Sequence, residues 1–85
     1  MPEARYRYRA DVLEALWQHG VHPTDRTSPA LVHEFVGDLY RYEIRRLRDR
    51  MVRREFPKQE YLDRVVQLRR RYPVISMKPD AWLIR

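Results

Sequence analysis

The stretch between Pro29 and Pro57 constrains the fold most, because it contains no proline and repeats apolar residues at helical spacing. Ser28 belongs to the residue types that cap helix N-termini. Proline is tolerated at the first helical position, where its missing N–H has no intrahelical partner. These signals predict one long central helix over about residues 28–55, roughly 40 Å in length.

The apolar residues of this helix fall on two stripes, the first made of Leu31, Phe35, Leu39 and Tyr42, and the second of Val36, Tyr40, Ile44, Leu47 and Met51. A helix that is apolar over so much of its circumference is typical of a central element packed on both sides. We therefore expect the first stripe to lie in the core or in an apolar interface.

One shorter helix is expected before the central helix and another after it. Asp11 and Glu14 have the spacing of a capping box, and Gly20 supplies the left-handed conformation that often ends a helix. A third helix is expected after Pro57 and has to end before Pro73, since the residue preceding proline disfavours helical geometry.

The two ends of the chain differ in composition. Residues 1–10 alternate arginine and tyrosine only briefly, which favours a flexible arm or the frayed start of the first helix. Residues 73–85 are too apolar for a free terminus, so we expect an extended tail docked through Trp82. The 85 residues therefore predict a single all-α domain of three helices with an extended apolar C-terminal tail.

Positive charge is concentrated in the second half of the chain. Residues 41–85 carry fourteen basic and six acidic residues, whereas residues 1–40 carry four and six. The arginines that could bind a partner or nucleic acid are Arg46, Arg50, Arg53, Arg54, Arg69, Arg70 and Arg71. Guanidinium forks bind phosphates, but cations are also favoured at helix C-termini for electrostatic reasons, so both interpretations remain open.

Residues with metal-binding or catalytic chemistry do not form a complete set. The chain has no cysteine, and His19, His22 and Asp25 supply too few ligands for a zinc site. His33 opens a zinc-protease-like pattern whose second histidine would fall at Gly37. Two glycines are too few for a phosphate-binding glycine-rich loop. We expect no metal, no cofactor, no small-molecule substrate and no enzymatic activity.

These observations favour a non-enzymatic helical protein-interaction module, either a homo-oligomer or an accessory subunit of a larger assembly, since the apolar content exceeds what three short helices bury. The alternative is a basic nucleic-acid-binding protein that uses its arginine-rich C-terminal half. The order of helix lengths resembles that of histone-type handshake dimers, although the loop 56–59 lacks the Arg-Thr signature of that family.

The sequence also indicates where in the cell the protein is located. No segment approaches the ~18 consecutive apolar residues that a membrane span requires. The first residues are rich in arginine and lead into no uncharged apolar stretch of the secretory type. We therefore expect a cytoplasmic protein without a membrane partner.

Overall fold

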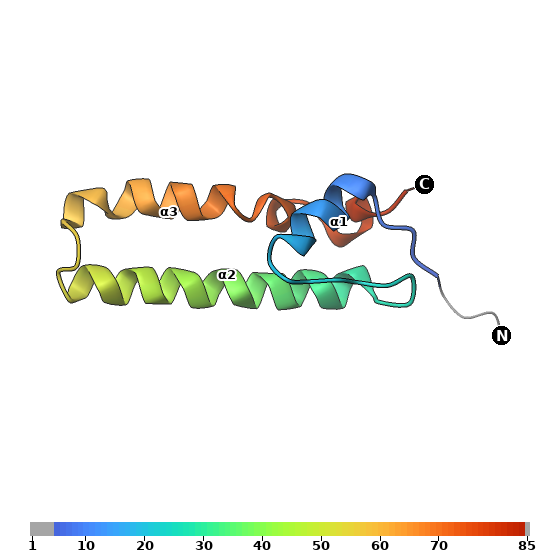
Figure 1. Cartoon of the computed structure of the whole chain (residues 1–85), viewed down its shortest axis with the longest axis horizontal. Helices are drawn as coiled ribbons and strands as arrows, with labels where there is room; N and C mark the ends of the chain where they lie inside the picture. The colour runs from blue at the N-terminus through green and yellow to red at the C-terminus, as the bar shows by residue number, and fades with distance from the viewer. Residues whose placement is uncertain (1–4, 85) are drawn as a thin grey trace.

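The computed structural model describes residues 5–84 and confirms the all-α class. Its helices are α1 (Ala10–Trp17), α2 (Pro29–Val52) and α3 (Tyr61–Arg70). Three short 3₁₀ turns cover Lys58–Glu60, Pro73–Ser76 and Pro79–Trp82. The molecule is elongated, with extents of 55 × 19 × 18 Å. Helices α2 and α3 run antiparallel as a hairpin, while α1 and the last turns gather at the end of the hairpin nearest the termini (Figure 1).

The start of α1 differs from the predicted capping box. The helix begins at Ala10, and its N-cap is Arg9 rather than Asp11. The carboxylate of Asp11 accepts hydrogen bonds from the Val12 N–H at 3.0 Å and from the Arg9 guanidinium at 2.7 Å. The box does not form because Asp11 already lies in the first turn, where no reciprocal bond with Glu14 can close it.

The end of α1 follows the prediction for Gly20. The Val21 N–H donates to the Leu16 carbonyl at 3.1 Å, and the Gly20 N–H donates to the Trp17 carbonyl at 2.9 Å. Gly20 has a φ of +74°, which places it in the left-handed region. This hydrogen-bond pattern is a Schellman motif, and it turns Val21 back toward the core.

Helix α2 begins at Pro29 after Ser28, as the sequence predicts, but it ends three residues before the predicted Glu55. The Glu55 N–H donates to the Arg50 carbonyl at 3.0 Å, which is the same Schellman bond that ends α1. Arg54 takes the position of the glycine, with a φ of +63°. The helix stops at Val52 because this motif reverses the chain toward α3.

The most enclosed part of the core surrounds Trp82, which is fully buried. Its indole packs against the rings of Tyr8 and His33, with centroids 6.5 and 5.3 Å away, and its N–H donates to the Val74 carbonyl at 3.2 Å. The tail is therefore anchored at this residue. Its predicted extended conformation is not confirmed, because Pro73 and Pro79 each begin a 3₁₀ turn.

The segment preceding α1 lies against this tail. Tyr8 forms an isolated antiparallel bridge with Leu83, and the Ile84 N–H donates to the Arg7 carbonyl at 2.8 Å. Tyr8 is buried, and its hydroxyl donates to the Thr27 carbonyl at 2.5 Å. Of the arm expected over residues 1–10, the first four residues lie outside the described part of the chain, and the rest is held by these contacts.

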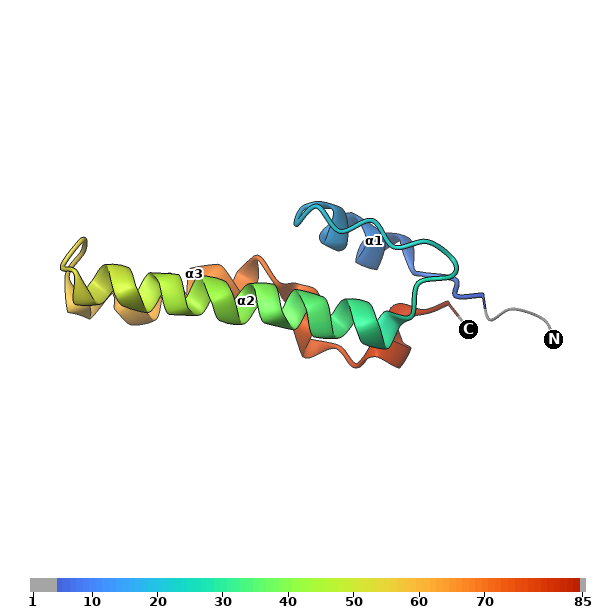
Figure 2. The same ribbon diagram turned by 90° about the horizontal axis from the view of Figure 1, so that it is seen from below.

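The prediction that α2 is packed on both sides is wrong. Along its first apolar stripe, Leu31, Phe35 and Tyr42 are 66%, 54% and 55% exposed, and only Leu39 is half-buried. Helix α1 lies near the end of α2 that carries Leu31 and Phe35 (Figure 2), but the side chains buried at this end are Val32 and Val36, which point to another face of the helix. The second stripe faces α3 and the tail instead.

Candidate functional site

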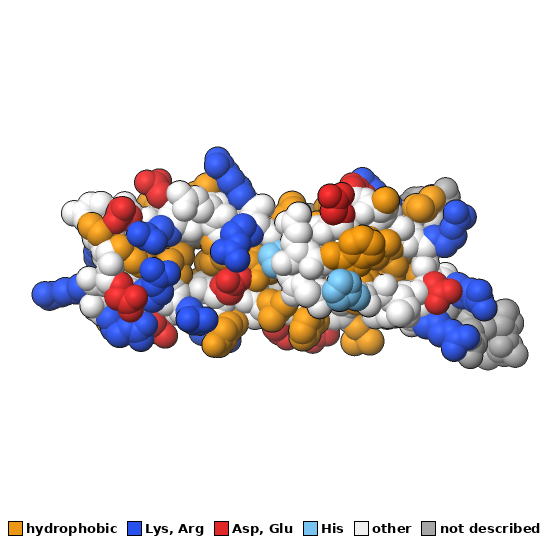
Figure 3. Space-filling model, in the orientation of Figure 1, with side chains coloured by type: hydrophobic (Ala, Val, Ile, Leu, Met, Phe, Trp, Pro, Cys, Tyr) orange, Lys and Arg blue, Asp and Glu red, His pale blue; other side chains and the backbone are white. Residues whose placement is uncertain are grey.

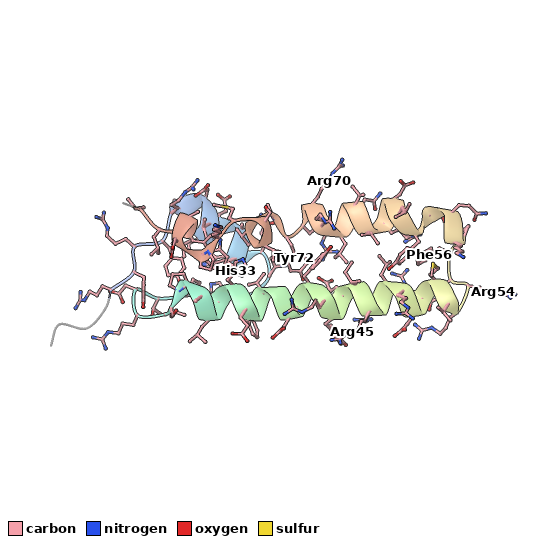
Figure 4. The ribbon with its side chains drawn as sticks, turned by 180° about the vertical axis from the view of Figure 1, so that it is seen from behind. His33, Arg45, Arg54, Phe56, Arg70 and Tyr72 are labelled. Carbon is pink, nitrogen blue, oxygen red and sulfur yellow. The ribbon has the colours of Figure 1, made fainter. Side chains whose placement is uncertain are left out.

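The arginines at the end of α2 do not share one face. Arg46 and Arg50 lie on the helix and border a groove between α2 and α3. Arg53 pairs with Glu55 at 2.9 Å. Arg54 lies beyond the helix at the tip of the hairpin, where its positive φ turns it out of the helical pattern (Figure 4). These candidate arginines are therefore divided between the groove and the tip of the hairpin.

The three consecutive arginines at the end of α3 are Arg69, Arg70 and Arg71. They also point in different directions, since neighbours on a helix are about 100° apart. Arg71 borders the same groove as Arg46, and Arg69 borders a different one. Arg70 is exposed and points away from α2 (Figure 4). Of these three, only Arg71 thus shares a groove with Arg46 and Arg50.

The groove that collects arginines, here called the basic groove, has a volume of about 340 Å³. Its lining consists of Glu43, Arg46, Leu47, Arg50, Arg64, Gln67, Leu68 and Arg71. Figure 3 shows this face, with basic side chains on both helices around hydrophobic ones. Sequence reasoning did not select Arg64. Its spacing of seven residues from Arg71 repeats one face of a helix, and this signal could have identified it.

Aromatic rings hold three of these guanidinium groups. Phe56 is buried and points into the space between the helices (Figure 4). The guanidinium carbon of Arg64 lies 4.2 Å from the centroid of the Phe56 ring, and that of Arg50 lies 5.6 Å away. Arg46 lies 5.9 Å from the Tyr42 ring. Cation–π attraction favours these positions of the guanidinium groups beside the rings.

The inner end of the basic groove is closed by a polar contact. The Tyr72 hydroxyl donates to the Glu43 carboxylate, which also lies 3.9 Å from Arg71. Burial raises the pKa of Tyr72 to about 12, and the hydrogen bond and negative charge of Glu43 add to this effect. Glu43 is therefore committed to Tyr72 and Arg71, and it does not offset Arg46 as its position in the sequence would allow.

A second groove, here called the apolar groove, has a volume of about 460 Å³. Its lining consists of Tyr40, Arg41, Ile44, Arg45, Tyr61, Leu62, Val65 and Arg69. Helical spacing puts Ile44 and Arg46 on opposite sides of the buried Leu47, so this groove opens on the face opposite the basic groove. Tyr40 and Ile44, which belong to the second apolar stripe, are half-buried and pack against the core.

His19 and His22, which were considered as metal ligands, contact aromatic rings instead. His19 stacks on Tyr72 with centroids 4.0 Å apart and hydrogen-bonds the Arg71 carbonyl, whereas His22 lies against Trp17 at 6.1 Å. Within residues 5–84, no group of three or more potential metal ligands comes together. None of the helices in this part of the chain is long and apolar enough to cross a bilayer.

Comparison of the chain with protein-family models, with curated proteins and with solved structures finds no significant match. The functional argument therefore depends on the two grooves themselves.

Proposed function

We propose that the protein is a small helical protein-interaction module, which acts by binding rather than by catalysis, and that its apolar groove holds an amphipathic helix of a partner. The observation that carries this proposal is the exposure of Leu62, which is 73% accessible at the edge of the groove. Half-buried apolar side chains, Ile44 and Val65, lie beside it. Grooves of this kind bind the apolar face of a helix.

The thickness of the molecule supports the same proposal. Away from the termini, α2 and α3 have no third element against them (Figures 1 and 2). Val66 and Val52 are also 47% and 67% exposed in this half. Two helices cannot bury apolar residues on both of their faces, and a third helix in the groove would complete a bundle.

The charge at the border of the groove indicates an acidic partner. Arg45 and Arg69 have no carboxylate within 4.0 Å among residues 5–84, whereas Arg41 pairs with Asp38. A second copy bound through the same patch in a two-fold arrangement would bring equal charges together. Glutamate or aspartate on the flanks of a partner helix would be attracted instead. The groove therefore suits an accessory subunit better than a homodimer.

Titration with synthetic peptides tests this proposal. The first peptide is an amphipathic helix of ~15 residues with leucines on one face and glutamates on its flanks, and the second carries lysine in place of glutamate. We expect the acidic peptide to bind and to shift the NMR signals of Tyr61, Leu62 and Val65. Leu62→Glu should weaken binding at least tenfold, because it places charge in the apolar contact.

Leu31→Glu is the matched control, because Leu31 is similarly exposed (66%) but lies outside the groove. This control should bind the acidic peptide as the wild type does. Equal binding of the acidic and basic peptides would contradict the proposal. An equal loss in both variants would contradict it too, as would sedimentation showing that the groove is closed by a second copy.

A further inference from the structure

The basic groove is a second surface with binding groups that contacts within the molecule do not neutralise. Its lining contains four arginines and one carboxylate, that of Glu43. Arg46 and Arg64 have no carboxylate within 4.0 Å among the described residues. Arg50 shares Glu55 with Arg53, at 3.3 Å. The groove therefore retains an excess of positive charge contributed by both helices.

The arginines are also oriented before any ligand arrives. Phe56 contacts the guanidinium groups of Arg50 and Arg64, and Tyr42 contacts that of Arg46. Contact with a ring face leaves the N–H edges of a guanidinium group available, and each group has five N–H donors. Such donors bind phosphate oxygens through two parallel hydrogen bonds. Holding them in place reduces the entropy lost on binding.

The spacing of the arginines along the hairpin indicates an extended ligand. Arg46 and Arg50 are one turn apart, about 6 Å along α2, and Arg64 and Arg71 are two turns apart, about 10 Å along α3. A single phosphate needs one point of contact, whereas nucleic acid presents phosphates at short regular intervals. We propose that the basic groove binds the phosphodiester backbone of nucleic acid.

The same geometry predicts how selective this binding is. Phe56 is 6% exposed and lies beneath the arginines, so it cannot stack on a base. Phosphate contacts position a nucleic acid but carry no sequence information. The groove should therefore bind oligonucleotides of different sequence with similar affinity, and binding should weaken as salt increases.

Fluorescence anisotropy with a labelled oligothymidylate of ~12 nucleotides tests the inference, with measurements from about 50 to 200 mM salt. The test variant is Arg46→Gln combined with Arg64→Gln. Its affinity should fall at least tenfold, and the slope of log affinity against log salt should become less steep by about 1.4, since each single-strand phosphate contact contributes about 0.7. The NMR signals of Gln67 and Leu68 should shift when the oligonucleotide binds the wild type.

Arg48→Gln combined with Arg70→Gln is the matched control. It removes the same charge from the same two helices, but neither residue lines either groove. This control should keep nearly the wild-type affinity and slope. An equal loss in both double variants would show general charge attraction and overturn the proposal. The absence of oligonucleotide binding by the wild type at about 50 mM salt would overturn it as well.

The same binding experiment is repeated with inorganic polyphosphate as a second ligand. If it binds while the oligonucleotide does not, the assignment to nucleic acid is wrong. Arg64→Gln could disturb the packing of Phe56, so NMR mapping is done on the wild type as well. Shifts confined to the face of the apolar groove would also overturn the proposal. The inference is independent of the apolar groove, so the test variant should still bind the acidic peptide.

Discussion

The two ends of α2 are packed very differently. At the end near the termini, α1, the segment before it and the last turns pack on one side of the helix, and Val12, Leu16, Val36 and Trp82 are at most 1% exposed, while Leu31 and Phe35 on another side stay exposed. At the hairpin end only α3 covers α2, and the buried side chains there are Leu47, Phe56 and Leu68, at 6–8%. The same helix thus belongs to a closed core at one end and to an open hairpin at the other.

This difference separates stability from binding. Burial of apolar surface is the main favourable contribution to folding, and it is most complete around Trp82. The hairpin end leaves apolar side chains and guanidinium groups accessible on two opposite faces. Substitutions should therefore change stability mainly at the closed end and binding mainly at the open end.

Trp82→Ala should produce the largest effect on stability. Removing a fully buried indole, together with its hydrogen bond to the Val74 carbonyl, should reduce the free energy of unfolding by about 3–5 kcal/mol. Ile84→Ala in the same tail, at a side chain 49% exposed, should change it by no more than about 0.5 kcal/mol. Urea denaturation measures both. Similar losses in the two variants would mean that the closed end does not depend on the indole.

The two helix ends provide a second, smaller comparison, because the same Schellman motif contains Gly20 at one end and Arg54 at the other. Gly20→Ala should lower the free energy of unfolding by about 1 kcal/mol, since a side chain disfavours positive φ. A Cβ at Gly20 meets nothing within 4 Å, so the cost comes from the backbone alone. Arg54→Gly should raise stability by about 0.5–1 kcal/mol.

Thermal unfolding of the two variants checks this prediction. Opposite signs are expected, with a lower melting temperature for Gly20→Ala and a higher one for Arg54→Gly. If Arg54→Gly lowers stability, then the arginine side chain stabilises the tip by more than its backbone conformation costs.

The smallest expected effect concerns alkaline pH. Burial raises the pKa of Tyr8 and of Tyr72 from 10.0 to about 12. Between these pH values the folded state holds protons that the unfolded state has lost, so the contribution of the two tyrosines to stability should be constant below pH 10 and be lost as pH rises toward about 12. Ultraviolet absorbance of tyrosinate should show that Tyr8 and Tyr72 lose their protons above pH 10.

Substitution of Glu43 distinguishes the titration of Tyr72 from that of Tyr8. Glu43→Gln should lower the pKa of Tyr72, because it removes the negative charge beside the hydroxyl, and should leave Tyr8 at the closed end unchanged. If both titrations move together, their high pKa values do not arise from their separate surroundings.

The sequence alone determined the local features of this protein. Helix starts and ends are governed by a few adjacent residues, so Ser28, Pro29 and Gly20 predicted boundaries that the structure confirms. The capping box at Asp11 and the end of α2 at Glu55 were wrong, because Arg9 and Arg54 adopt cap and left-handed conformations that their residue types do not favour.

Only the tertiary structure decided which apolar stripe is buried and which arginines meet. Periodicity gives the faces of a helix but not the position of its neighbours. The core contains Val32, Val36 and Leu47 of α2, which leaves Leu31, Phe35 and Tyr42 exposed on another face. Likewise, Arg46 and Arg64 are eighteen residues apart and share a groove only because the hairpin folds α3 back along α2. Such contacts depend on the packing of whole elements, which local spacing does not encode.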